Sequence, residues 1–417
     1  MKAPLCVLLA LTGLAPVAAN AAAQSASQAT MQPTTVAIHV REIGGIRRSA
    51  FPVTARVPLP RAALTDTAHA RLLLKDAEVP VQVTATSRWP DGSLQWVDVD
   101  FNVSPGPGDF VDYVLEYGPG VSAAAVARGL SVVEEADAIQ VGNVRFGRSA
   151  APLMSSVKYR DEAIAAGVNG VMVIDAAGVE HALSSAEGLK VEVIKRGPLV
   201  VALKYSGTVA LPGTARAPVS LTIEMPSSKS WVKFAATVDD SSRQVGALTL
   251  STPLALGPLP WVWDFGTNRW TYGQLRTATD NVTLSSVRAR SGVQWSVAAG
   301  LKGREQPVET NALDHSPFNG WGHIQGGKEV VAFAVEGATD RSGTTRVALS
   351  GDGQTTFRFS PSSAQTHFEL TVYEHFVATP VQIGAATSPA AILSPPTALC
   401  DRVQYTRSGV PVPIGVP

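Results

Sequence analysis

Alternating apolar and polar residues dominate the chain, with the two-residue period of β-strands rather than the period of helices. The first such runs are VAIHV, FPVTARVPLP, ARLLL, VPVQVTATSRW, LQWVDVDF and YVLEYG, and proline, glycine and aspartate separate them. These residues favour turns, so the runs are expected to be short strands. The pattern predicts a small β-barrel or sandwich over residues 35–120.

The clearest local element is a hairpin in RWPDGSLQWVDVDF, residues 88–101. Its proline–aspartate–glycine sequence supplies the residues that a turn requires. In the strand that follows, every second residue from Val97 to Phe101 is apolar, while Asp98 and Asp100 lie between them. The strand is therefore expected to have one buried face and one polar face.

The second part of the chain, residues 130–378, contains ten or more further runs of this kind, among them VSLTIEM, SWVKFAATV, EVVAFAVEG and HFELTVYEHFV. This is too many strands for one immunoglobulin-type sandwich. We expect a large, antiparallel, two-sheet β-sandwich and an all-β protein. Residues 24–34 are expected to form a disordered linker, and residues 379–417, rich in Pro, Ala and Ser, an irregular C-terminal tail.

The N-terminus has the features of an export signal over residues 1–23. A charged start precedes the apolar segment 5–14, and small residues follow it. No apolar run is long enough to span a bilayer. After cleavage Cys400 would be the one cysteine left, so we expect no internal disulfide, and a secreted or periplasmic bacterial protein.

The charge balance excludes several classes of partner. Lys plus Arg and Asp plus Glu number 34 each, so no overall field attracts nucleic acid or an anionic membrane. The sequence contains no phosphate-binding loop, no HExxH motif and no paired-cysteine zinc pattern. No cofactor is expected, with Ca²⁺ at the acidic pairs Asp98/Asp100 or Asp239/Asp240 as the one metal alternative.

Two regions carry a resemblance to known families. IRRSAFPVTARVPLPRAAL (46–64) and LLLKDAEVPVQVTATSRWPDGSLQWVDVDF (72–101) resemble the N-terminal RIFT-barrel domain of the exo-rhamnogalacturonan lyase (YetA-like) family. RGPLVVALKYSG (196–207) and SKSWVKFAATVDD (228–240) are similar to strands of the galactose-mutarotase-like β-supersandwich of polysaccharide lyases. The resemblance implies a polysaccharide or oligosaccharide substrate that contains uronate, cleaved by β-elimination.

β-Elimination requires a base, a group that neutralises the uronate carboxylate, and an acid for the leaving oxygen. HFELTVYEHF (367–376) places Tyr373 and His375 on one strand face, opposite an apolar face that Glu374 interrupts. Either residue is a candidate to abstract the proton, Tyr373 if a cation lowers its pKa.

The predicted hairpin GWGHIQGGKEVVAFAVEG offers a second group of candidates. A two-residue Gly-Gly turn would place Gln325 opposite Lys328 and His323 opposite Val330. Trp321 would then join these side chains on one face, where an aromatic ring, a histidine and a lysine suit a sugar acid. We expect His323 to assist catalysis and Lys328 to bind the carboxylate.

Further substrate-binding candidates lie in WVWDFGTNRWTYG (261–273), which we interpret as an aromatic segment rich in loops. Trp263, Trp270 and Tyr272 are expected to bind sugar rings, and Arg269 is an alternative partner of the uronate carboxylate. His315, in the loop before the hairpin, is expected at the same rim.

Two other functions stay open at this point. A glycoside hydrolase would use two carboxylates, for which Glu336, Glu369 and Glu374 are available. A non-catalytic carbohydrate-binding protein would use the aromatic side chains alone.

Overall fold

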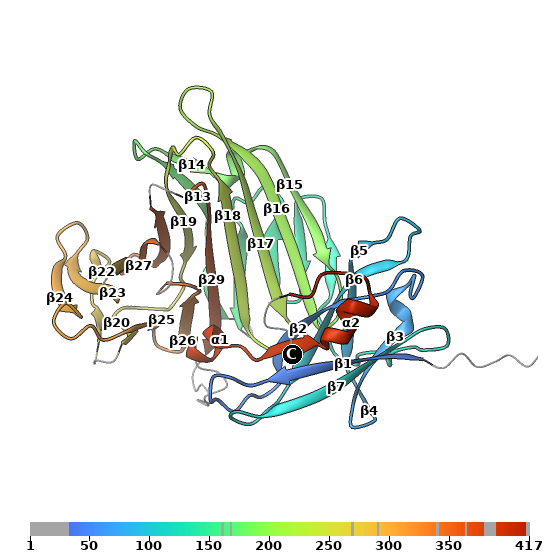
Figure 1. The fold of residues 1–417 in the computed structure, drawn as a ribbon. Helices are drawn as coiled ribbons and strands as arrows, with labels where there is room; N and C mark the ends of the chain where they lie inside the picture. Colours follow the sequence, from blue (N-terminus) through green and yellow to red (C-terminus); the bar gives the residue numbers. More distant parts are fainter. Residues whose placement is uncertain are drawn as a thin grey trace, which may run out of the picture. The chain divides into compact units, whose positions relative to one another are not determined.

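A computed structural model of the chain describes residues 33–413, except for 160–161, 167–168, 268–270, 290–291, 339–341, 363–364 and 379–388. The signal peptide expected over 1–23 and nearly all of the linker expected over 24–34 lie outside this part. The described residues belong to one compact unit. Their fold is almost entirely β, with a small barrel followed by a large antiparallel sandwich, as predicted (Figure 1).

Two small sheets form the barrel. In the first, the strand order is β30 (Thr397–Cys400), β1 (Thr34–Arg41), β7 (Phe110–Tyr117), β3 (Ala70–Leu74), β4 (Ala77–Val79). In the second it is β2 (Phe51–Pro58), β6 (Leu94–Val103), β5 (Val81–Arg88), and a 3₁₀ turn, η1 (Thr67–His69), precedes β3. Alternate residues of these strands fill one shared core, as the sequence pattern predicts.

The C-terminal tail is not irregular, and that expectation is wrong for its described part. Helix α1 (Pro389–Leu393), strand β30 and helix α2 (Arg402–Arg407) follow one another. β30 pairs antiparallel with β1, so that Cys400 lies opposite Ile38 and is buried in the barrel core. Apolar runs this short gain enough burial only against distant segments, here the barrel and strands β25 (Phe318–Gln325) and β26 (Glu329–Val335) of the sandwich, which local sequence does not reveal.

Most of the sandwich consists of two broad sheets. The order in the nine-stranded sheet, here the large sheet, is β15 (Glu187–Lys195), β16 (Val200–Ala210), β17 (Arg216–Pro226), β18 (Trp231–Asp239), β29 (His367–Ala378), β26 (Glu329–Val335), β25 (Phe318–Gln325), β20 (Trp261–Thr267), β21 (Tyr272–Leu275). The order in the eight-stranded facing sheet is β14 (Glu180–Ala182), β13 (Gly170–Asp175), β19 (Val245–Pro253), β28 (Gln354–Pro361), β27 (Gly343–Ser350), β22 (Asp280–Ala289), β23 (Gly292–Leu301), β24 (Gln306–Thr310).

A third, five-stranded sheet adds to the two that the pattern predicts. Its order is β12 (Glu162–Ala166), β11 (Met154–Tyr159), β10 (Val144–Gly147), β9 (Ala138–Val141), β8 (Val132–Glu134), and a 3₁₀ turn, η2 (Leu183–Ser185), follows β14. Apolar residues from all three sheets belong to one hydrophobic core. β29 shows the alternation clearly, because its even-numbered apolar residues enter this core, and Phe368 contacts Phe359 of the facing sheet with ring centres 6.3 Å apart.

The barrel packs against the sandwich through the polar face of its hairpin. The ammonium of Lys195 lies 3.0 Å from a carboxylate oxygen of Asp98 and 3.0 Å from one of Asp100. Gln82 of the neighbouring strand donates to the carbonyl of Val200 at 2.9 Å. The alternation on β6 is thus as predicted, but the sandwich covers its polar side. None of the helices among the described residues is long and apolar enough to cross a membrane.

Candidate functional site

The outer face of the large sheet, which is turned away from the facing sheet, gathers many of the predicted residues. Strand register places Glu224 of β17, Lys233 of β18, Tyr373 of β29, Ala334 of β26 and Trp321 of β25 in one row across it. Neighbouring strands are about 4.8 Å apart, so the side chains of adjacent members of this row are in contact range.

The row carries acid–base groups in the order carboxylate, ammonium, phenol. Lys233 Nζ lies 5.4 Å from the centre of the Tyr373 ring, and Glu224 is the cross-strand neighbour of Lys233. The Tyr373 hydroxyl donates to Oε2 of Glu336, an exposed residue just after β26, at 3.4 Å. Glu224, Lys233, Tyr373 and Glu336 are here called the Tyr373 cluster.

Burial and charge set the protonation states within the cluster. Burial would lower the pKa of Lys233, but Tyr373, Glu224 and Glu336 together raise it, so the ammonium stays charged. Burial raises the pKa of Tyr373 more than Lys233 lowers it, so the phenol stays protonated at neutral pH. The expected cation is present, yet it does not make Tyr373 a base. The resting cluster holds a proton donor beside a fixed positive charge.

Glu336 connects the Tyr373 cluster to a cavity of about 650 Å³, here called the junction cavity. The barrel contributes Ile46 to its wall, the tail contributes Leu393 and Ser394, and the sandwich contributes Asn319 and Glu336 among others. A cavity of this size is within the range of small-molecule sites. Because three segments far apart in sequence meet there, the cavity exists only in the folded chain.

A buried ion pair fixes the tail wall of this cavity. The Arg48 guanidinium donates to the carbonyls of Ala391 at 2.6 Å and Ser394 at 2.5 Å, and to the Glu42 carboxylate at 2.7 Å. Both charged side chains are 0% exposed. Burial would raise the pKa of Glu42, but Arg48 and three backbone N–H groups lower it to about 2. The pair is therefore ionised at neutral pH.

His375 is not available on an open face. It is only 6% exposed, and Nε2 lies 2.6 Å from Ser230 Oγ. Burial and the nearby Lys229 ammonium lower its pKa to about 4, so the imidazole is neutral. Trp231, its cross-strand neighbour, packs against Phe51 of the barrel, with ring centres 5.5 Å apart. The barrel thus covers the part of the outer face on which the sequence pattern places His375 beside Tyr373.

Further predicted residues meet on strands β25, β20 and β21, at one edge of the outer face. His323 Nδ1 lies 2.5 Å from Oδ1 of Asp264, which is opposite it on β20. Tyr272 of the edge strand is opposite Asp264 and 63% exposed, and the half-buried Gln325 lies two residues beyond His323 on the same face. An exposed aromatic ring, an Asp–His pair and an amide thus form a continuous polar strip.

The predicted register of the hairpin is wrong by two residues. Gln325 pairs with Val330 and His323 pairs with Ala332, and the Gly326 N–H donates to the Glu329 carbonyl at 3.0 Å, so the turn lies at Gly327 and the exposed Lys328. Gly326 explains the difference, because a Cβ there would lie 1.7 Å from the carbonyl oxygen of Leu256. This glycine allows close packing and lies directly before the turn, not within it.

The aromatic candidates divide between core and surface. Trp263 is 4% exposed and packs beside Phe265 in the sandwich core, so its predicted substrate contact is wrong. The segment was interpreted as a loop, whereas β20 directs alternate aromatic residues inward. Trp321 stays half-buried, with its indole over Gly266. His315 is exposed in the loop before β25, whereas Arg269 and Trp270 lie outside the described residues.

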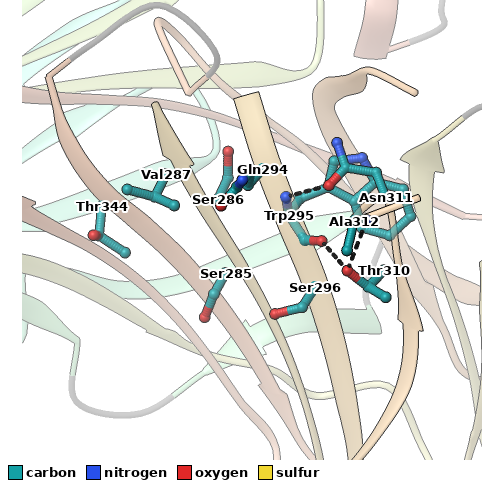
Figure 2. A pocket seen from close by; sticks show the side chains of 10 residues that line it. All are labelled: Ser285, Ser286, Val287, Gln294, Trp295, Ser296, Thr310, Asn311, Ala312 and Thr344. Carbon is teal, nitrogen blue, oxygen red and sulfur yellow. Dashed lines mark hydrogen bonds between the residues drawn. The ribbon is translucent and has the colours of Figure 1, made fainter. Parts of the chain in front are cut away.

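A second cavity, of about 350 Å³, lies on the facing sheet (Figure 2). Its lining has hydroxyl and amide groups but no ionisable side chain. Asn311, which is fully buried, accepts from the Trp295 backbone N–H and donates to the carbonyls of Val293 and Ser316, each at 2.8 Å. These hydrogen bonds of Asn311 join protein groups to one another. Because no lining side chain is ionisable, this cavity offers no acid–base chemistry.

The acidic pairs named for calcium have other partners. Lys195 occupies the space between Asp98 and Asp100, and Asp239 pairs with His367 at 2.6 Å. Asp240 accepts from the backbone N–H of Val245. In the part of the chain that the structure describes, no group of three or more His, Cys, Asp or Glu side chains could hold a metal ion.

Glu224 and Lys233 were not predicted from the sequence, and Glu336 was predicted only as a possible hydrolase carboxylate. The signal for Lys233 was present, since it occupies an outward position in WVKFAATV. The alternation gave no strand order, so it did not indicate that Glu224 and Tyr373 flank this lysine.

Comparisons with known proteins support the fold. Residues 36–109 match the family model described as the PcRGLX-like N-terminal RIFT barrel domain. The fold is similar to an α-mannosidase from Enterococcus faecalis V583, with a TM-score of 0.53, 10% identity and coverage of 88% of this chain and 46% of that one. A protein in glycosyl hydrolase family 38 from Enterococcus faecalis gives the same TM-score and identity, with 88% and 47% coverage. The chain thus spans about half the length of these structures, and at this identity the similarity shows the fold alone. No curated protein matches the sequence.

Proposed function

We propose that this protein is a secreted, carbohydrate-active enzyme, specifically a lyase that cleaves a uronate-containing polysaccharide by β-elimination. The observation that carries the proposal is the row Glu224–Lys233–Tyr373, which reaches Glu336 at the junction cavity. It supplies a fixed cation, a proton donor and a carboxylate base within one partly desolvated site.

Each residue of the Tyr373 cluster has one role in the proposed reaction. Lys233 pairs with the uronate carboxylate and stabilises the negative charge that develops when the α-proton leaves. Glu336 takes that proton, the electron pair forms the new carbon–carbon double bond, and the bond to the leaving oxygen breaks. Tyr373 gives its proton to this oxygen, and Glu224 keeps Lys233 charged and oriented.

The polar strip on the last strands of the outer face would bind neighbouring sugar rings. Tyr272 offers an exposed ring for stacking, and Gln325 and the Asp264–His323 pair offer hydrogen bonds to hydroxyl groups. The match of residues 36–109 to the RIFT-barrel family model supports a carbohydrate-active role.

The test is the absorbance of unsaturated uronate near 235 nm while purified protein acts on rhamnogalacturonan, glucuronan, alginate and glycosaminoglycans, with and without Ca²⁺. We expect Tyr373→Phe and Lys233→Met each to lower the rate on the responsive substrate by roughly 10²-fold or more. Tyr113→Phe in the barrel core and Lys204→Met elsewhere on the large sheet are matched controls. No absorbance on any substrate, or a Tyr373→Phe variant as active as the controls, contradicts the lyase.

A hydrolase is the second candidate, because Glu224 and Glu336 place two carboxylates near Tyr373. Such an enzyme would release reducing ends without absorbance near 235 nm. Glu336→Gln and Glu224→Gln would then both abolish the release, whereas Tyr373→Phe would have the smaller effect.

A further inference from the structure

A serine and a histidine contact each other at the start of β18, in a place that the Tyr373 chemistry does not use. Ser230 directly precedes the strand and is exposed, whereas His375 of β29 is buried. The Ser230 hydroxyl and His375 Nε2 are 2.6 Å apart. The backbone fixes this pair, since the Ser230 carbonyl accepts from the Phe376 N–H at 3.3 Å.

The surroundings keep the imidazole in its basic form. Burial and the Lys229 ammonium hold the pKa of His375 near 4, so Nε2 can accept the serine proton at neutral pH. Lys229 is itself fixed, because it donates to the carbonyl of Ser49 at 2.6 Å and lies 5.9 Å from the Trp231 ring centre. A serine within hydrogen-bond distance of a neutral histidine is the arrangement that activates a hydroxyl nucleophile.

Ser230 opens onto a cavity of about 210 Å³ with walls of two kinds. Val144, Met225 and Phe376 make an apolar wall, which suits a short acyl chain. Asn143 and Lys158, both exposed, also line it and carry hydrogen-bond donors of the kind that stabilise an oxyanion. The nucleophile, an apolar wall and polar donors therefore line one small cavity, and His375 contacts the nucleophile beside it.

We propose that Ser230 and His375 hydrolyse esters of short acyl groups, as an activity separate from the Tyr373 cluster. Ser230 Oγ attacks the ester carbonyl carbon while His375 Nε2 takes the hydroxyl proton. The bond to the alcohol oxygen then breaks, and this oxygen receives the proton from His375. Water, deprotonated by His375, cleaves the acyl-serine to the free acid and restores both side chains.

The first experiment measures hydrolysis of p-nitrophenyl acetate and labelling by a fluorophosphonate probe, located by peptide mass spectrometry. We expect the label on Ser230 of the natural chain, and no label at that position in Ser230→Ala. Ser228→Ala is the matched control, because Ser228 is two residues away and its hydroxyl donates to Asn102 at 2.9 Å. This control is expected to hydrolyse the ester and take the label like the natural chain.

The base is tested by His375→Gln and by the pH profile. The variant is expected to lose roughly 10²–10⁴-fold in rate. In the natural chain the rate should rise with an apparent pKa of about 4, because His375 loses its proton there. From pH 5 to 8 the imidazole is neutral, so the rate should stay constant. A merely structural histidine would not produce this profile.

Absence of label at Ser230, or equal hydrolysis by Ser230→Ala and Ser228→Ala, overturns the proposal. Ser230 is at the surface, so its replacement tests the chemistry even if the buried His375→Gln variant does not fold. The synthetic ester contains no uronate, so these outcomes are independent of the outcome for the lyase.

Discussion

Glu374 makes the stability of this protein depend on pH in a predictable direction. Its side chain is 0% exposed and enters the sandwich core from β29. Thr252 Oγ1 donates to Oε2 at 2.7 Å, whereas Oε1 has no hydrogen-bond partner. Burial raises the pKa of this carboxyl to about 7, although Thr252 opposes the shift. The perturbation we propose is Glu374→Gln, which keeps the shape and removes the titration.

The magnitude follows from linkage between proton binding and folding. The pKa of Glu374 is about 7 in the folded chain and 4.5 as its ordinary value, which we take for the unfolded chain. The folded state therefore binds the proton more tightly than the unfolded state. The contribution of Glu374 to the unfolding free energy is fully present below pH 4.5 and is lost as the pH rises through about 7. The total loss is about 3 kcal/mol, at 1.36 kcal/mol per pKa unit. Roughly 2–3 kcal/mol of it falls between pH 5 and 8.

Urea unfolding at pH 5 and pH 8 measures this loss. The difference in unfolding free energy between Glu374→Gln and the natural chain should shift by roughly 2–3 kcal/mol in favour of the variant at the higher pH. Glu187→Gln, an exposed carboxylate paired with Arg216, is the control, and its difference should change by less than about 1 kcal/mol. If the Glu374→Gln difference is the same at both pH values, the carboxyl does not carry the proton that its burial implies, and the reasoning is refuted.

Three further predictions concern contacts that shape the site. Arg48→Met should cost about 3–5 kcal/mol of unfolding free energy, because it leaves the buried Glu42 charge unpaired, and limited proteolysis should then cleave the tail faster. Gly266→Ala should displace the Trp321 indole, since the new Cβ would lie 2.2 Å from Cε2, and should cost about 1–3 kcal/mol with a change in tryptophan fluorescence. Lys195→Met leaves the buried Asp100 carboxylate uncompensated and should lower the urea midpoint more at pH 8 than at pH 4, where that carboxylate can protonate; an equal drop at both would contradict it.

The period of the apolar residues was sufficient to predict an all-β chain and, for the strands that it identified, their two faces. On β29 the even positions face the core and the odd positions face outward, as alternation requires. The turn before β6 also follows from local chemistry, since Gly92 adopts a positive φ of 86° and its N–H donates to the Trp89 carbonyl. These features depend on residues that are close in sequence, so they could be predicted from the sequence.

Predictions about the site were less complete, because they required the partners of each strand. Tyr373 was recognised, but Lys233 beside it comes from a strand more than a hundred residues earlier. Trp263 was assigned to the surface, because without the neighbours of β20 its two faces could not be told apart. His375 was expected to form an acid/base pair with Tyr373, but the barrel covers its part of the outer face.

The sequence by itself determined that the chain folds as strands, and which residues of each predicted strand share a face. Only the tertiary structure decided which face meets water, which strands are neighbours, and that β30 completes the barrel sheet. The physical reason is that alternation is a property of one strand, whereas burial, pKa and contact are properties of pairs of segments. The Tyr373 cluster and the junction cavity arise entirely from such pairs.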